Sequence, residues 1–133
     1  MIAADTNLLV RYITRDDPKQ FHAVTRFLEE AERKEEPVLI MNEILIETVW
    51  VLKSVYHASR ERLCELLETI VTIDALRFED DSLVREAVAV YRKSNLEFAD
   101  VFLVLKARRV RARFATFDSR ILTQFPETAV LPS

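Results

Sequence analysis

Short apolar runs alternate along the chain with longer segments in which apolar residues recur every three or four positions. The short runs predict buried strands, and the three-to-four spacing predicts amphipathic helices. Strands alternating with helices indicate an α/β fold with a parallel sheet covered on both faces. Strands are expected at residues 1–4, 37–41, 73–78, 113–116 and 129–131, and helices from Thr6 or Asn7, from Pro18, and over 43–56, 60–71, 80–93 and 95–110.

Polar residues mark several helix starts. Asp17 precedes Pro18, which suits the first turn of a helix, and Asn42 and Ser59 stand where caps are expected. The helices at 43–56 and 95–110 are apolar on almost all sides and are therefore expected to be largely buried. Their aromatic residues, Trp50 and the pair Phe98 and Phe102, are expected in the core.

The length and composition fit one soluble globular domain, residues 1–133. Of the 133 residues, 50% are hydrophobic and 31% are charged, which is typical of a globular protein. No apolar run approaches the roughly 18 residues of a membrane span, and the start does not resemble a signal peptide. A single cysteine, Cys64, fits a reducing cytoplasm.

Missing residue types exclude several classes of site. The chain has no glycine, which removes phosphate-binding glycine loops and the dinucleotide fingerprint. Two histidines and one cysteine cannot build a zinc finger or a Cys–His triad. The net charge of −3 argues against a surface that binds nucleic acid everywhere. Catalysis must therefore rest on carboxylates, hydroxyls or cationic side chains, with or without a metal ion.

Four acidic residues stand where apolar residues would serve stability better. Asp5 and Asp118 directly follow predicted strands, and Glu47 and Asp100 lie within the two apolar helices. Sites in parallel α/β sheets form at the carboxyl ends of the strands, so the four side chains are expected to converge. No lysine or arginine directly adjoins any of the four, and a hard divalent cation, Mg²⁺ or Mn²⁺, would relieve their repulsion.

Each of these residues also has a purely structural interpretation. Asp5 could cap the following helix, Asp118 could belong to a turn, and Glu47 could point to solvent. Asp100 is the hardest to explain in this way, because its neighbours are mostly apolar; a cap or an ion pair remains open.

At these residues the chain resembles a known family. Residues 1–10, 47–52, 97–100 and 116–118 are similar to the four motifs of PIN domains. The nearest resemblance is to the VapC-like toxin ribonucleases of type II toxin–antitoxin modules. Each motif is short, but four in order over nearly the whole chain are fairly specific.

The resemblance implies a three-layer α/β/α sandwich with a central, mostly parallel sheet of four to five strands. It also implies Mg²⁺-dependent endonucleolytic cleavage of RNA, with a tRNA favoured and Mn²⁺ as a possible substitute. A homodimer and a small VapB-like antitoxin that covers the site are the implied partners. The acidic quartet corresponds to Asp5, Glu47, Asp100 and Asp118, supporting polar positions to Thr6, Asn7 and Thr116, and an additional acidic position, usually Asp, to Glu97.

A basic stretch follows the last apolar helix, with five positive charges in eight residues. One interpretation is a solvated helix end, where cations complement the helix dipole. The other is a surface that contacts RNA phosphates. The candidate RNA-binding residues are Lys106, Arg108, Arg109 and Arg111, with Arg113 beside them, and Arg11 and Arg15 near Asp5.

Three functions compete at this point. A metal-dependent endoribonuclease explains the quartet best. A catalytically inactive PIN-type module that binds RNA or antitoxin would not need four clustered carboxylates. An aspartyl-phosphate phosphatase is disfavoured, because the haloacid dehalogenase type requires a second Asp where this chain has Asn7.

Overall fold

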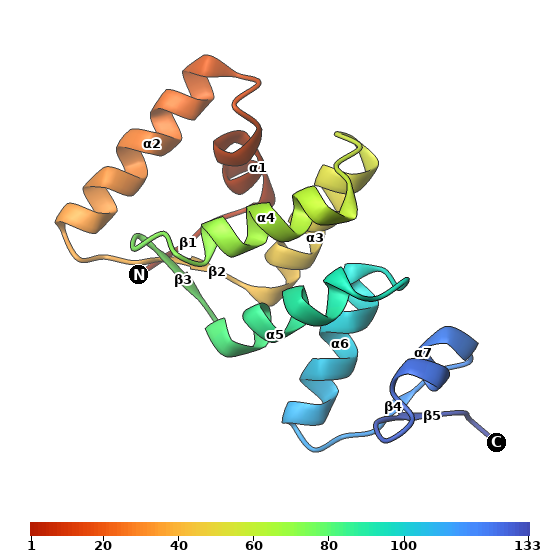
Figure 1. The fold of residues 1–133 in the computed structure, drawn as a ribbon. Coiled ribbons are helices and arrows are strands. Elements are labelled where there is room, and N and C mark those ends of the chain that lie inside the picture. The colour runs from red at the N-terminus through yellow and green to blue at the C-terminus, as the bar shows by residue number, and fades with distance from the viewer. The chain divides into compact units, whose positions relative to one another are not determined.

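The computed structural model describes residues 1–133, and the chain divides into two compact units. The N-terminal unit comprises Met1–Asp81 and the C-terminal unit Ser82–Ser133. In Figure 1 the N-terminal unit runs from red to green and the C-terminal unit from green to blue. None of the helices is both long enough and apolar enough to cross a bilayer.

The N-terminal unit is built on a three-stranded parallel sheet with β2 in the centre (Figure 1). Two helices separate each strand from the next, as parallel pairing requires. Asp17 and Ser59 cap α2 and α4 as expected, by accepting hydrogen bonds from Gln20 and Arg62. In order, the elements are β1 (Ile2–Ala3), α1 (Thr6–Thr14), α2 (Pro18–Arg33), β2 (Val38–Ile40), α3 (Asn42–Ser54), α4 (Arg60–Ile70) and β3 (Leu76–Phe78).

The two edge strands of this sheet differ in burial, since Leu76 and Phe78 on β3 are buried whereas the residues of β1 are exposed. Val38 and Ile40 on the central strand are fully buried. Ile2 pairs with Val38 on the edge strand and remains 49% exposed. The prediction of a strand within residues 1–4 is confirmed, but the expected burial holds only for Ala4, which follows β1.

The C-terminal unit combines three helices with a two-stranded parallel sheet. Its aromatic core joins two helices: Tyr91 meets Phe98 edge to face at 5.6 Å, and Phe98 lies 5.7 Å from Phe102. The expected burial of Phe98 and Phe102 is confirmed. The elements are α5 (Asp81–Arg92), whose first residue precedes the unit boundary, α6 (Phe98–Arg109), β4 (Phe114–Ala115), α7 (Ser119–Gln124) and β5 (Ala129–Val130).

The α/β class, the parallel strands and nearly all predicted elements are confirmed. The five strands lie in sheets of three and two, whereas one sheet of four to five strands was expected. The helix α7 was not predicted, because six residues are too short to show a periodic pattern.

Two expectations for α3 are wrong. Its buried residues are Leu45, Thr48, Val49 and Leu52, a single face, and Trp50 is 63% exposed. An apolar helix has no polar face from which its solvent side could be predicted. Asn42 also does not cap α3; it is the first helical residue, and its backbone N–H donates to the carboxylate of Glu79.

Without glycine, the chain places charged residues in left-handed backbone conformations. Glu35 has φ 56° just after α2, and the N–H of Glu36 bonds the carbonyl of Ala31 at 2.9 Å, a helix end that usually carries glycine. A left-handed L-residue costs about 1–2 kcal/mol.

We therefore expect Glu35→Gly to raise the free energy of unfolding by about 1 kcal/mol in urea titrations. Glu35→Ala removes the same charge but keeps the strain; an equal gain there would contradict the explanation.

Candidate active site

Asp118 is held in place by its own helix and by the preceding strand. It is the N-cap of α7, and its Oδ1 accepts the backbone N–H of Arg120 at 2.9 Å. Its own backbone N–H donates to the hydroxyl oxygen of Thr116 at 3.0 Å. Thr116 therefore positions Asp118 directly, which is the kind of support that the family resemblance implied.

Asp100 lies half-buried on the first turn of α6, in the same unit. Burial is the main cause that raises the pKa of its carboxyl group, and the negative charges of Asp118 and Glu97 add to it. A hydrogen bond from the backbone of Glu97 and the charge of Arg120 act in the opposite direction. The folded C-terminal unit thus disfavours the charge on Asp100, as expected for a carboxylate close to other acidic groups.

Arg120 supplies the positive charge that the sequence analysis did not find. Its guanidinium group contacts both carboxylate oxygens of Asp118, Nη2 to Oδ2 at 3.1 Å and Nε to Oδ1 at 3.3 Å. These contacts lower the pKa of Asp118. Arg120 does not directly adjoin Asp118 in the sequence; it is two positions away, where the first turn of α7 brings it back to its cap.

The other two carboxylates belong to the N-terminal unit. Asp5 is the N-cap of α1, and its Oδ1 accepts the N–H of Leu8 at 2.9 Å. Glu47 is exposed on α3. Glu79, which the sequence analysis missed, bonds the backbone N–H of Asn42 and fixes the start of the helix that carries Glu47. Glu79 follows β3 directly, so the rule that selected Asp5 and Asp118 would have selected it as well.

The remaining positions implied by the resemblance differ in their surroundings. Thr6 is buried, and its Oγ1 has no hydrogen-bond partner. Asn7 is exposed, and Glu97 is the exposed residue that precedes α6. Buried hydroxyl groups almost always have a partner, so the Thr6 hydroxyl is an exception to this rule, directly after Asp5 in the sequence.

The four candidate carboxylates are thus divided equally between the units. Asp100 and Asp118 interact electrostatically in the C-terminal unit, and Asp5 and Glu47 lie on neighbouring helices, α1 and α3, that contact each other. No group of three or more His, Cys, Asp or Glu side chains forms a metal-binding cluster in the structure. The joint action of all four stays a prediction.

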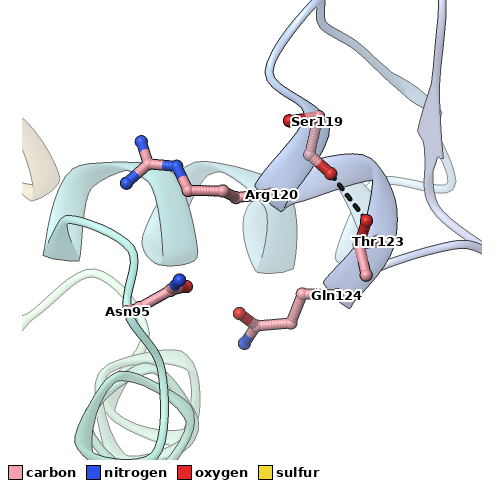
Figure 2. Close-up of a pocket in the computed structure, with 5 residues that line it drawn as sticks. All are labelled: Asn95, Ser119, Arg120, Thr123 and Gln124. Carbon is pink, nitrogen blue, oxygen red and sulfur yellow. Dashed lines mark hydrogen bonds between the residues drawn. The ribbon is translucent and has the colours of Figure 1, made fainter.

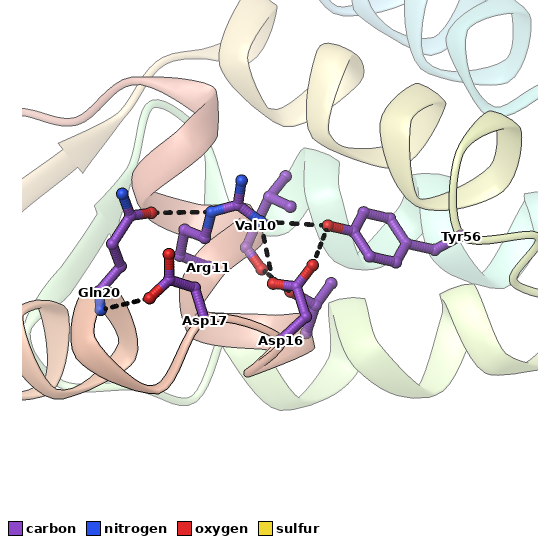
Figure 3. A network of polar contacts seen from close by, with 7 residues as sticks. Val10, Arg11, Asp16, Asp17, Gln20 and Tyr56 are labelled. Carbon is purple, nitrogen blue, oxygen red and sulfur yellow. Dashed lines mark hydrogen bonds and ion pairs between the residues drawn. The ribbon is translucent and has the colours of Figure 1, made fainter.

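Arg11, a candidate RNA-binding residue, takes part in a polar network within the N-terminal unit (Figure 3). It donates to Gln20 at 2.8 Å and to Asp16 at 2.9 Å, and Tyr56 donates to the other oxygen of Asp16 at 2.7 Å. The guanidinium group of Arg15 lies over the ring of Phe21, 4.8 Å from its centroid. Both arginines therefore have structural contacts of their own.

This network predicts a specific dependence of stability on pH. Hydrogen bonds from Tyr56, Thr14 and Arg11 lower the pKa of Asp16 from its ordinary 3.8. A lowered folded pKa stabilises the protein above 3.8, and this contribution disappears as the pH falls through the folded value. Asp16→Asn should therefore lower the urea midpoint at pH 7 and approach wild type in acid. Asp74→Asn, in an exposed turn, is the control; a difference that is constant down to pH 3 would contradict the prediction.

The basic stretch is also partly engaged in its own unit. Arg109 pairs with Glu86 at 3.0 Å, and Arg108 donates to the hydroxyl oxygen of Thr128 at 3.2 Å. Lys106 is half-buried near the end of α6, and Arg111 is exposed with φ 60°. These contacts give Arg108 and Arg109 structural roles, and RNA binding by the stretch stays a prediction.

Comparison with known proteins agrees with this arrangement of motifs. A VapC ribonuclease of Aquifex aeolicus (strain VF5) is 29% identical over 106 residues, which cover 80% of this chain and 78% of the relative. No solved structure is significantly similar to the chain. The family model of the PIN domain matches residues 2–129, and thus spans all four carboxylates. The chain belongs to the PIN domain family.

Proposed function

We propose that this protein is a metal-dependent endoribonuclease, the toxin of a type II toxin–antitoxin module. The observation that carries the proposal is the match to the PIN domain, which includes Asp5, Glu47, Asp100 and Asp118 within one family pattern. A relative named as a VapC ribonuclease supports RNA as the substrate, and we propose a tRNA. Because the match spans the two units, we also propose that residues 1–133 act as a single PIN domain.

The residues present fit a hard divalent cation, Mg²⁺ or Mn²⁺. The donors are carboxylate oxygens, the ligands that such ions prefer. Asp100 has a raised pKa in the absence of a cation, and the buried hydroxyl of Thr6 lacks a partner. A bound ion would lower the pKa of a water molecule and polarise the phosphodiester. We propose that the four carboxylates hold it together, with Glu97 as an additional acidic neighbour.

The contacts of the chain prepare these side chains for that task. Asp5 uses Oδ1 to cap α1, which leaves Oδ2 for a ligand. Thr116 fixes the backbone of Asp118, and Glu79 fixes the first residue of α3, the helix that carries Glu47. Catalytic ligands work best when neighbouring groups orient them in this way. Asn7, exposed beside Thr6, is proposed to support the same site.

The proposal extends to partners. A ribonuclease toxin must be restrained in the cell that produces it, and we propose a VapB-like antitoxin whose tail covers the carboxylates. We also propose a homodimer. The basic candidates on α6 and the exposed Arg111 would contact RNA phosphates, which provide affinity rather than sequence readout.

The direct test is incubation of the purified chain with total tRNA in millimolar Mg²⁺ and in chelator. Discrete fragments that appear only with the metal are expected. RNA that is bound but never cleaved would favour the inactive binding module. If the chain neither binds nor cleaves RNA, the proposed function is wrong.

A further inference from the structure

A pocket of about 280 Å³ opens in the C-terminal unit beside α7 (Figure 2). It is lined only by polar side chains, and none of them is acidic. The absence of acids disfavours a cationic ligand, and the absence of apolar side chains disfavours a peptide anchor. The lining residues are Asn95, Ser119, Arg120, Thr123 and Gln124.

The amide side chains of Asn95 and Gln124 could both form hydrogen bonds with one flat polar ligand. Figure 2 shows the amides of Asn95 and Gln124 pointing toward one another across the hollow. Ser94 holds Gln124 by donating to its Oε1 at 2.9 Å, while the Ser94 hydroxyl oxygen accepts the N–H of Leu96 at 2.9 Å. With Oε1 engaged, the Nε2 group of Gln124 can donate into the pocket.

Arg120 connects the pocket to the candidate active site. The same guanidinium group that lines the pocket contacts both carboxylate oxygens of Asp118. An arginine side chain has five N–H donors in a planar fork that matches phosphate. A ligand in the pocket that carries a phosphate would therefore place it next to Asp118.

We infer that this pocket binds one nucleotide of the RNA strand next to the cleaved bond. Asn95 and Gln124 contact the edge of its base, and Arg120 contacts its phosphate. Asn95 supplies a donor and an acceptor and Gln124 supplies a donor, and such groups distinguish base edges. The inference rests on the proposed function and deepens it, because it assigns a base preference to residues outside the carboxylate quartet.

The test uses an RNA with a randomised segment, and the 5′ ends produced by the whole chain in Mg²⁺ are sequenced. Asn95→Ala and Gln124→Ala are compared with wild type. Each should weaken the preference for one base within two nucleotides of the cleaved bond, by about tenfold, the order expected for one base contact. Glu127→Gln, an exposed substitution in the turn after α7, should keep the wild-type preference.

The outcomes separate the two ideas. Unchanged base preference in both variants, with melting temperatures equal to wild type, overturns the pocket inference and leaves the nuclease intact. Gln124→Ala could unfold because it loses the hydrogen bond with Ser94. In that case the base preference of Asn95→Ala, a substitution at an exposed residue, decides whether the inference holds. If wild type does not cleave at all, the proposed function fails. The pocket is then tested by sequencing the randomised RNA that each protein captures in chelator, where the same loss of preference is expected.

Discussion

Asp100→Asn is expected to reduce metal-dependent RNA cleavage by at least about 100-fold, because even groups that only orient metal ligands are worth 10- to 100-fold. The same change should raise the melting temperature of the metal-free protein. Burial and the charges of Asp118 and Glu97 raise the pKa of Asp100. A carboxyl group with a raised folded pKa destabilises the fold once it is charged, so stability decreases as the pH rises through that value.

Two melts measure this prediction, one in chelator and one in millimolar Mn²⁺. Wild type should gain stability from the ion by mass action, and Asp100→Asn should gain much less. Asp74→Asn, in an exposed turn, should respond as wild type does. Asp100→Asn could instead melt at a lower temperature than wild type in chelator and gain as much stability from Mn²⁺. That result would show that the charge of Asp100 does not destabilise the fold and that Asp100 is not a metal ligand.

Arg120→Gln should change metal binding and catalysis in opposite directions. In the free protein Arg120 occupies both oxygens of Asp118, so a metal ion has to displace it. Removing an ion pair with this degree of exposure should tighten Mn²⁺ binding by about two- to fivefold. At saturating metal, kcat/KM should nevertheless decrease by about tenfold or more, because the proposed contact of Arg120 with the RNA phosphate is lost.

Calorimetric titration with Mn²⁺ and cleavage at saturating metal provide the two readouts. Arg85→Gln is a useful control, since it removes an arginine from the same unit without touching Asp118 or the pocket. If Arg120→Gln weakens metal binding, Arg120 organises the carboxylates instead of competing with the ion. If cleavage is unchanged, it does not contact the RNA.

The sequence pattern correctly placed Asp5 and Asp118 after strands, because both positions follow from strand ends. Asp5 and Asp118 were selected for following strands, and both prove to be N-caps of the next helix. Capping uses only Oδ1 of Asp5 and leaves Oδ2 for a ligand, whereas Arg120 also engages Oδ2 of Asp118. Both residues therefore have a structural role as helix caps, and this role does not exclude metal binding.

Features that depend on distant segments were not accessible to sequence patterns. The cap of α3 comes from Glu79, 37 positions along the chain from Asn42. The exposure of Trp50 depends on which face of an apolar helix meets the core. The pocket brings Asn95 together with the unpredicted α7. The role of Arg120 also depends on α7, because the first turn of this unpredicted helix brings Arg120 back to Asp118.

We propose that Asp5, Glu47, Asp100 and Asp118 bind one metal ion, and Mn²⁺ binding measured by electron paramagnetic resonance tests this proposal. Wild type, Asp5→Asn, Asp100→Asn and the double variant would be titrated under identical conditions. Either single substitution is expected to abolish tight Mn²⁺ binding, and the double variant is expected to lose nothing more. Single variants that each bind Mn²⁺ as wild type does, or that each lose a separate part of the signal, would contradict it.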